Sequence, residues 1–216
     1  MKAKRLCVLC GVNEATKGDG DHLPPQNIYP APRERDVALN RVPACLGCNQ
    51  AGSKDDEEFK MIIGLSTGDA RQNQEAIINS LAKTFNGNKK LGRRILKSSQ
   101  RTYARRNGGV LQPVVAFPFS REGYSRVITR IVRGLYWQQT GEVMQGKTVH
   151  VVHGDEPQGL LLQAIRKLLV MKDPVVLNGG TFVYKAFFDE ESDSSFWGLQ
   201  FFGSHTVFAL VTSETP

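Results

Sequence analysis

Apolar residues recur at the three- and four-residue spacing of amphipathic helices in several parts of the chain. One such pattern lies within residues 61–107 and ends near Gly87, a residue type that commonly follows the last turn of a helix. A second pattern begins at Tyr124 and ends near Gly141, and a third covers residues 160–170. Each pattern predicts a helix that packs one face against the rest of the protein.

Towards the C-terminus the period changes to the two-residue alternation of strands. Residues 181–188, 196–202 and 206–212 are predicted strands, and residues 148–152 form a shorter one. The connections between the last three are too short for crossovers, so we expect an antiparallel meander. Together with the helices, this pattern predicts the α+β fold class, with a small α+β domain at residues 108–216.

The four cysteines of the chain fall into two Cys-x-x-Cys pairs. Four thiolates at this spacing are typical of a tetrahedral Zn²⁺ site and leave no coordination position open for water. We therefore expect structural zinc, which a module of about 60 residues needs because its core is small. Free core cysteines and redox cysteines are the alternatives. The predicted zinc ligands are Cys7, Cys10, Cys45 and Cys48.

The residues around the cysteines predict a ββα module. Asp21 and His22 would lie on or beside a first strand, and residues 41–44 would form a second strand that leads into the second cysteine pair. A helix should follow from Asn49, with Ser53 as its N-cap and acidic residues in its first turn. Zinc would then lie at the base of this module.

Three domains are expected along the chain. Residues 1–60 form the zinc module, residues 61–107 a helical segment and residues 108–216 the α+β domain, with a hinge at residues 107–109. No run of about 18 or more apolar residues occurs, so we expect no transmembrane helix. The basic start is not followed by an apolar run, so we expect no signal peptide and a cytoplasmic protein.

Positive charge is concentrated in one stretch. The net charge is +7, residues 89–106 contribute +8 without an acid, and the rest sums to −1. A solvated helix face is the ordinary explanation, but uncompensated repulsion favours contact with a polyanion such as DNA or RNA. We expect one helix to present these side chains to phosphates. The predicted nucleic-acid-binding residues are Lys89, Lys90, Arg93, Arg94, Lys97, Arg101, Arg105 and Arg106, with Lys54 as a further contact.

The placement of Asp21, His22, Asn40 and Asn49 among the cysteine pairs resembles the HNH, or His-Me finger, endonucleases. The resemblance is to the branch with two zinc knuckles. Asn49 stands where many members have a final His, as in endonucleases of the phage endonuclease VII type. A wider resemblance to uncharacterised bacterial HNH proteins is carried by residues 21–25, 28–30, 42–45, 48–49 and 53–57.

This resemblance implies an enzyme that hydrolyses phosphodiester bonds of DNA. His22 would be the general base that takes a proton from water. Asp21 and Asn49 would hold one Mg²⁺ or Mn²⁺ through oxygen atoms. Asn40 would brace the loop that orients His22. A single such finger cuts one strand, so a monomer would nick, and cutting both strands would need a homodimer or two events.

Two alternatives share these features. A non-catalytic zinc module could bind DNA or RNA as an adaptor, although it has no use for the Asp21-His22 pair beside Asn49. An RNA-cleaving toxin could carry the same finger. The other histidines, His150, His153 and His205, are expected to be structural.

Overall fold

The computed structural model describes residues 5–16, 20–29, 40–66, 74–105, 111–152, 170–177 and 180–213 of the 216-residue chain. Several sequence predictions lie outside these ranges, namely those for Arg106, the hinge at residues 107–109, His153 and the helix at 160–170 except for Val170. The side chain of Arg105 is also outside the described part. No helix among the described residues is long and apolar enough to cross a membrane.

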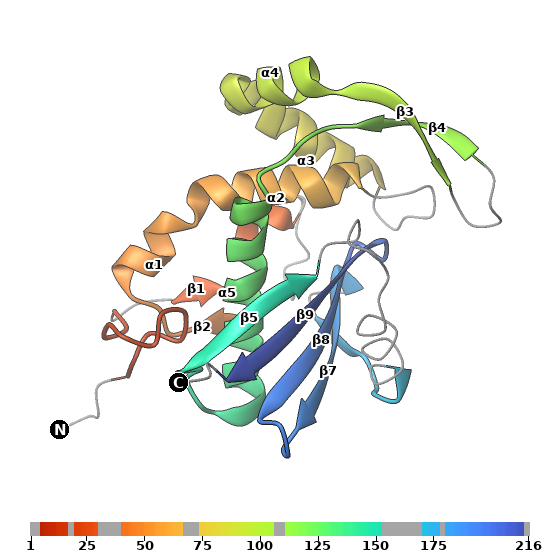
Figure 1. The fold of residues 1–216 in the computed structure, drawn as a ribbon. Coiled ribbons are helices and arrows are strands. Elements are labelled where there is room, and N and C mark those ends of the chain that lie inside the picture. Colours follow the sequence, from red (N-terminus) through yellow and green to blue (C-terminus); the bar gives the residue numbers. More distant parts are fainter. Residues whose placement is uncertain are drawn as a thin grey trace.

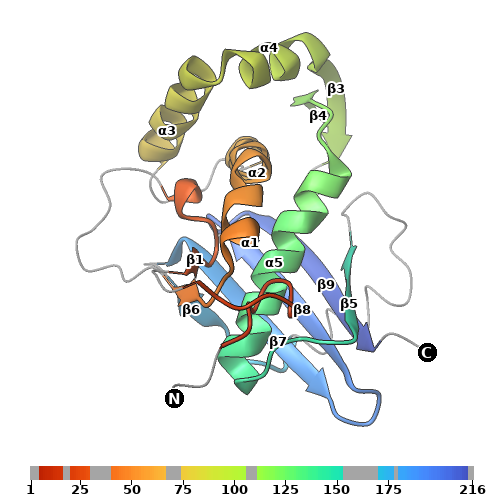
Figure 2. The ribbon, with the colours of Figure 1, turned by 90° about the vertical axis from the view of Figure 1, so that its left-hand side faces the viewer.

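The N-terminal part has the order strand, strand, helix. Its strands β1 and β2 pair antiparallel, with His22 opposite Arg41. The figures show this small sheet beside the long helix α5 (Arg121–Thr140) (Figures 1 and 2). The elements of this part are β1 (Asp21–His22), the 3-10 helix η1 (Gln26–Ile28), β2 (Arg41–Val42), α1 (Leu46–Ala51) and α2 (Ser53–Leu65).

Two predicted helix boundaries in this part are wrong. The helix begins at Leu46 rather than Asn49, because Cys45 is its N-cap and the sulfur of Cys45 accepts a hydrogen bond from the N–H of Cys48 at 3.5 Å. The N-cap of α2 is Gly52, and Ser53 is the first residue of that helix. The acidic first turn is confirmed, since it contains Asp55 and Asp56, where carboxylates interact favourably with the helix dipole.

The helical segment ends earlier than the sequence predicts. Helices α3 (Gln74–Gly87) and α4 (Lys89–Ser98) are followed by a hairpin of β3 (Gln100–Arg105) and β4 (Leu111–Ala116). The prediction of a single basic helix is therefore wrong beyond Ser98, since Arg101 and Arg105 lie on a strand. The Ser98 and Ser99 hydroxyls each donate to a helix carbonyl at 2.6 Å, the kind of local bond that competes with helix continuation.

Helix α5 spans the C-terminal five-stranded sheet. It begins at the N-cap Ser120, whose hydroxyl accepts from Gly123 N at 3.1 Å, and ends at Gly141, which has a φ of 77°. The sheet is antiparallel, in the order β5-β9-β8-β7-β6, so the predicted meander is confirmed. The predicted strand at residues 148–152 lies at one edge as β5, and β6 is an additional strand at the other edge. Its strands are β5 (Lys147–Val152), β6 (Val175–Leu177), β7 (Phe182–Asp189), β8 (Ser194–Phe201) and β9 (His205–Ser213).

One hydrophobic core joins the N-terminal part to the sheet. It contains Cys7, Val42 and Phe59 together with Ile128 of α5 and Trp197 of β8, all at most 1% exposed. A second cluster packs α3 and α4 against α2 (Figure 2). Its buried members are Met61, Ile77, Leu81, Leu91 and Ile95. In the described residues the first and last predicted domains thus share a core, while the predicted boundaries themselves stay predictions.

Candidate functional site

The four cysteines come together at the N-terminal end of α1. Their sulfur atoms all lie within 4.8 Å of one another. Tetrahedral zinc with Zn–S bonds of about 2.3 Å separates sulfur atoms by about 3.8 Å, which this cluster can adopt with small shifts. The four cysteines could therefore bind a structural Zn²⁺, as their spacing predicts.

Backbone N–H groups prepare two of these thiols for deprotonation. Burial raises the pKa of Cys10, but the N–H groups of Asn13 and Val12 outweigh it and lower the value to about 7. The Cys48 N–H lowers the pKa of Cys45, whereas burial raises the pKa of Cys7 and Cys48. Thiolates are the form that binds zinc, so the backbone N–H groups at Cys10 and Cys45 favour the form that a zinc site requires.

The carboxylate of Asp21 belongs to a buried ionic cluster that is centred on Arg130. Its Oδ1 accepts from the N–H of His22 at 2.9 Å, and its Oδ2 accepts from Nη2 of Arg130 at 2.5 Å. Nη1 of Arg130 donates to Oδ1 of Asp56 at 2.8 Å. One arginine of α5 therefore holds both β1 and α2.

The charges in this cluster do not cancel. Burial raises the pKa of Asp56 to about 6, although Arg130 opposes the rise. Burial would lower the pKa of Arg130, but Asp56 and Asp21 outweigh burial and raise it. Above pH 6 two carboxylates share one guanidinium, so the cluster carries one negative charge in excess.

His22 lies on β1, half-buried, beside an arginine of the neighbouring strand. Its ring nitrogen Nε2 accepts a hydrogen bond from Nε of Arg41 at 3.0 Å. Arginine can only donate, so Nε2 carries a lone pair in this arrangement. The backbone carbonyl of Asn40 accepts from the N–H of Leu23 at 2.8 Å, which ties β2 to the residue after His22. A side-chain role for Asn40 stays a prediction.

The predicted Mg²⁺ ligands do not fit that ion as they are arranged. Both carboxylate oxygens of Asp21 accept hydrogen bonds, and the residue is 8% exposed. Asn49 lies on α1 and is exposed. A divalent cation at Asp21 would have to displace Arg130 or share the carboxylate with it. Among the described residues, the cysteines are the only group of three or more His, Cys, Asp or Glu side chains close enough to hold a metal.

The basic residues of α4 lie on its outer face. Leu91, Gly92 and Ile95 face inwards, and Arg94 forms an ion pair with Glu58 of α2 at 2.7 Å. Arg101 is exposed on β3. Lys54 is exposed on α2 and lies far from the basic residues of α4 in the sequence. The exposed basic residues of α4 are Lys89, Lys90, Arg93, Arg94 and Lys97.

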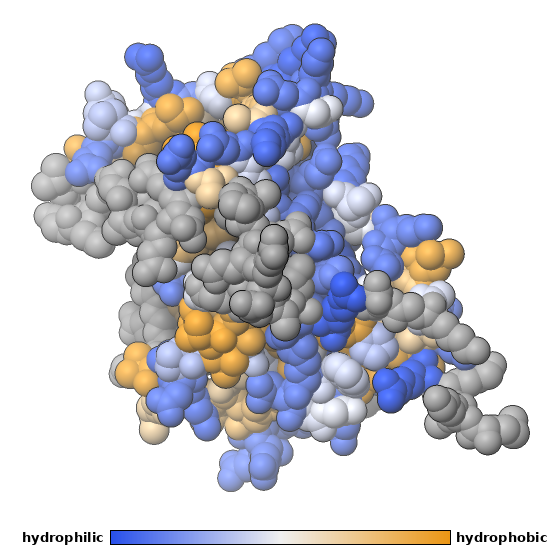
Figure 3. Space-filling view, turned by 180° about the vertical axis from the view of Figure 1, so that it is seen from behind, coloured by the Kyte–Doolittle hydropathy of each residue, from blue (hydrophilic) through white to orange (hydrophobic). Residues whose placement is uncertain are grey.

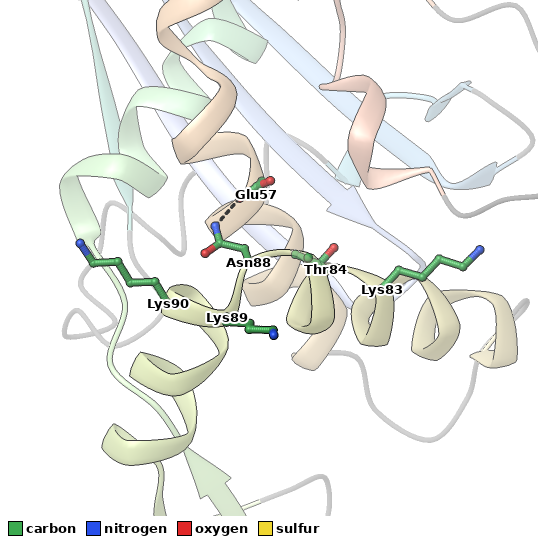
Figure 4. Close-up of a pocket in the computed structure, with 7 residues that line it drawn as sticks. Glu57, Lys83, Thr84, Asn88, Lys89 and Lys90 are labelled. Carbon is green, nitrogen blue, oxygen red and sulfur yellow. Dashed lines mark hydrogen bonds between the residues drawn. The ribbon is translucent and has the colours of Figure 1, made fainter.

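A shallow groove of about 700 Å³ lies where α3 meets α4. The amide of Asn88 donates to Glu57 of α2 at 2.7 Å on its floor, and Figure 4 shows Lys83 and Lys90 extending to opposite sides of it. The groove is bordered by positive charge and continues into the basic face of α4.

Sequence reasoning missed the contacts that the arginines of α5 make with the N-terminal half of the chain. Arg126, Arg130 and Arg133 recur at four- and three-residue spacing on α5, and each reaches the N-terminal half: Arg126 contacts Asp55, and Arg133 donates to the Leu9 carbonyl at 2.8 Å. Charged residues at helical spacing beside a buried face were the available signal. Their partners lie far away in the sequence, so the pattern alone does not identify them.

In comparisons with protein-family models, with curated proteins and with solved structures, nothing matches this chain. Its function must therefore be inferred from the chemistry of the residues above.

Proposed function

We propose that this protein is a metal-dependent endonuclease that hydrolyses phosphodiester bonds of DNA, with His22 as its general base. One observation carries the proposal. His22 and Arg41 lie opposite each other on paired strands, and Nε2 of the half-buried His22 accepts a hydrogen bond from Nε of Arg41 at 3.0 Å. An imidazole that can accept a proton and a guanidinium that can bind phosphate are thereby held together. The resemblance to HNH endonucleases assigns the same residue, His22, as the base.

The cysteine cluster supports the proposal by stiffening the frame around His22. The N–H of Val8 donates to the carbonyl of Pro43 at 2.9 Å, and Thr16 donates to that of Ala44 through both its N–H and its hydroxyl. These bonds join the first cysteine loop to the segment after β2. A zinc ion held by the cysteines would lock this connection, and a base must be positioned within a fraction of an ångström to work.

The chemistry that these side chains can perform is proton transfer next to a bound phosphate. A phosphodiester that reaches the strand pair would draw the Arg41 guanidinium towards its oxygens, since guanidinium binds phosphate by two parallel hydrogen bonds. Nε2 of His22 would then be left to take a proton from an attacking water. Arg41 would thus position the phosphate, and until the substrate arrives it occupies the lone pair of Nε2.

The metal part of the proposal makes a specific demand on Arg130. Asp21 and Asn49 can hold Mg²⁺ or Mn²⁺ only if Arg130 leaves Oδ2 of Asp21 or shares that carboxylate. The excess negative charge of the Asp21–Arg130–Asp56 cluster favours a cation nearby.

A non-catalytic zinc adaptor for DNA or RNA is the second candidate, and the Asp21–Arg130 ion pair favours it. In that case the carboxylate serves only to anchor α5 to β1. The basic face of α4 would serve either function equally.

A plasmid-nicking assay separates these candidates. Wild type, His22→Ala and His150→Ala are compared in Mg²⁺ and in EDTA; His150 is an exposed histidine of β5 and controls for loss of an imidazole. We expect nicking in Mg²⁺ by wild type and His150→Ala only. Binding without cleavage by all three proteins would support the adaptor, and cleavage of RNA in place of DNA would support the toxin alternative.

A further inference from the structure

The β3–β4 hairpin is a two-stranded ribbon with an exposed apolar face. Six residue pairs join its strands, from Gln100 and Ala116 to Arg105 and Leu111. Tyr103, Leu111 and Val115 are 70%, 60% and 63% exposed. Such side chains contribute little to folding where they lie, which indicates a surface that is covered by a ligand.

The ribbon has two different faces. Side chains alternate along a strand and cross-strand partners share a face, so Arg101 and Tyr103 lie on the same face as their partners Val115 and Pro113. On the opposite face Ala104 and Val114 are half-buried. The other described residues of that face are exposed, so both faces are open to solvent, and the face that carries Arg101 and Tyr103 is the more exposed of the two.

Helix α4 adds positive charge at the start of this ribbon. It leads into β3 through Ser99 alone, and its outward residues are all basic except Leu96, which is 70% exposed. Figure 3 shows hydrophilic and hydrophobic residues interspersed at the end of the molecule that carries α4 and the hairpin. Apolar contacts and cations are thus offered together.

Charge decides which ligand this surface fits. Residues 89–106 contain eight basic residues and no acid, so a second copy of the chain would bring like charges together across a two-fold axis. A polyanion relieves the same repulsion. Figure 1 shows the ribbon projecting beyond the helices as a narrow arm. This shape is suited to entering a groove rather than to lying on a flat surface.

We propose that the β3–β4 ribbon enters the major groove of double-stranded DNA while α4 binds the flanking phosphates. The major groove is about 12 Å wide and admits a two-stranded ribbon. A six-residue strand spans about 20 Å, enough to cross it. Arg101 would contact guanine edges, and Val115 and Leu111 would contact thymine methyl groups. This inference rests on the proposed function in taking DNA as the ligand.

The two elements are expected to contribute differently. Contacts of α4 to phosphate carry no sequence information and depend on salt, whereas contacts of the ribbon to base edges discriminate between sequences. The ribbon therefore supplies sequence preference and α4 supplies affinity.

Fluorescence anisotropy in EDTA tests the inference without cleavage, using random-sequence duplexes, the duplex selected from them by binding, and single strands of the same length. Lys90→Ala/Arg93→Ala should weaken binding to every duplex and reduce the salt slope by about 2. Arg101→Ala and Tyr103→Ala should each weaken binding to the selected duplex by about 5- to 100-fold and to random duplex far less. Lys172→Ala, which removes an exposed charge elsewhere, should change binding by less than about twofold.

Each of these substitutions is at an exposed position, and an unchanged thermal midpoint confirms folding. Protection of guanine N7 from methylation, lost in Arg101→Ala, would support entry into the major groove. Tighter binding to single strands, or Tyr103-dependent binding to anionic phospholipid vesicles without binding to DNA, would overturn the inference. If the wild-type protein binds duplex DNA through the ribbon but does not cleave it, the proposed function alone is contradicted. If it cleaves DNA but its binding does not depend on the ribbon, this inference alone is contradicted.

Discussion

Arg130 of α5 donates a hydrogen bond at 2.5 Å to the carboxylate of Asp21, which lies 109 positions earlier in the chain. The same guanidinium binds Asp56, so one side chain holds the strand of His22, the helix after the cysteines and the long helix under the sheet. This contact gives Asp21 a structural role that competes with the metal-binding role implied by the HNH resemblance.

Removal of Arg130 should be costly. Arg130→Met leaves two largely buried carboxylates without their partner, and loss of one member of a buried ion pair lowers the free energy of unfolding by about 3–5 kcal/mol. Arg126→Met is the matched control, since Arg126 lies one turn earlier and pairs with Asp55 while 59% exposed. The control should cost less than about 1 kcal/mol. Urea unfolding measures both, and equal losses would show that Arg130 is not a buried anchor.

The position of Arg130 requires glycine at position 52. A Cβ at Gly52 would lie 2.0 Å from Nη1 of Arg130, so Gly52→Ala should displace the guanidinium and lower stability by about 1–3 kcal/mol. A Cβ at Gly47 on α1 meets nothing within 4 Å. Gly47→Ala should therefore raise stability by about 0.5–1 kcal/mol through helix propensity. Opposite signs in thermal unfolding are expected, and a neutral Gly52→Ala would contradict the packing.

The cysteine cluster should hold one zinc ion per chain. Metal analysis of the purified protein should find zinc at a ratio near one, with thiols that react with a thiol reagent only after a chelator removes the metal. Cys48→Ser should lose the zinc and lower the thermal midpoint. Freely reactive thiols in a protein that contains no zinc would contradict the assignment.

His205 should make the protein less stable in mild acid. Its Nε2 lies 2.7 Å from the Tyr124 hydroxyl, and burial lowers its pKa from 6.5 to about 4. Between pH 6.5 and 4 the unfolded chain binds a proton that the folded protein does not, so stability falls as pH falls, by at most about 3 kcal/mol.

The carboxyl group of Asp56 has the opposite effect on stability as the pH falls. Its pKa is raised to about 6, so the folded protein binds this proton at a higher pH than the unfolded chain does. The comparison must therefore be with His205→Gln, in which only the histidine contribution is lost. Urea unfolding from pH 7 to 4 should give a smaller loss of stability in His205→Gln than in wild type. Parallel pH profiles would refute a buried neutral His205.

Local pattern predicted most of the fold. Helix α5 and its end at Gly141 follow from periodicity and one glycine, and strands β7 to β9 follow from alternation. The end of α4 was not predicted, because the spacing of the basic residues continues past Ser98 and Ser99. The side chains of these two serines stop the helix by hydrogen bonds to its carbonyl groups. The three-residue strand β6 is too short to show any period.

The candidate site was predictable only where its residues are near in sequence. The cysteine spacing predicts their cluster, because each pair forms one tight loop, and Asp21 and His22 are adjacent. Arg130 was not predictable, since its ion pairs depend on how α5 packs against β1 and α2. The contact of Arg41 with His22 was not predictable either, because it depends on the strand register.

The central claim, that His22 is the general base of a nuclease, is tested most directly by single-turnover cleavage of end-labelled duplex DNA in Mg²⁺. The zinc-loaded wild type, His22→Ala and His150→Ala are compared, with duplex binding measured in parallel in EDTA. The account predicts a loss of about 100-fold or more for His22→Ala at unchanged binding, with His150→Ala cleaving at the wild-type rate. Equal cleavage rates for His22→Ala and wild type, or an absence of cleavage by any of the three folded proteins, would contradict it.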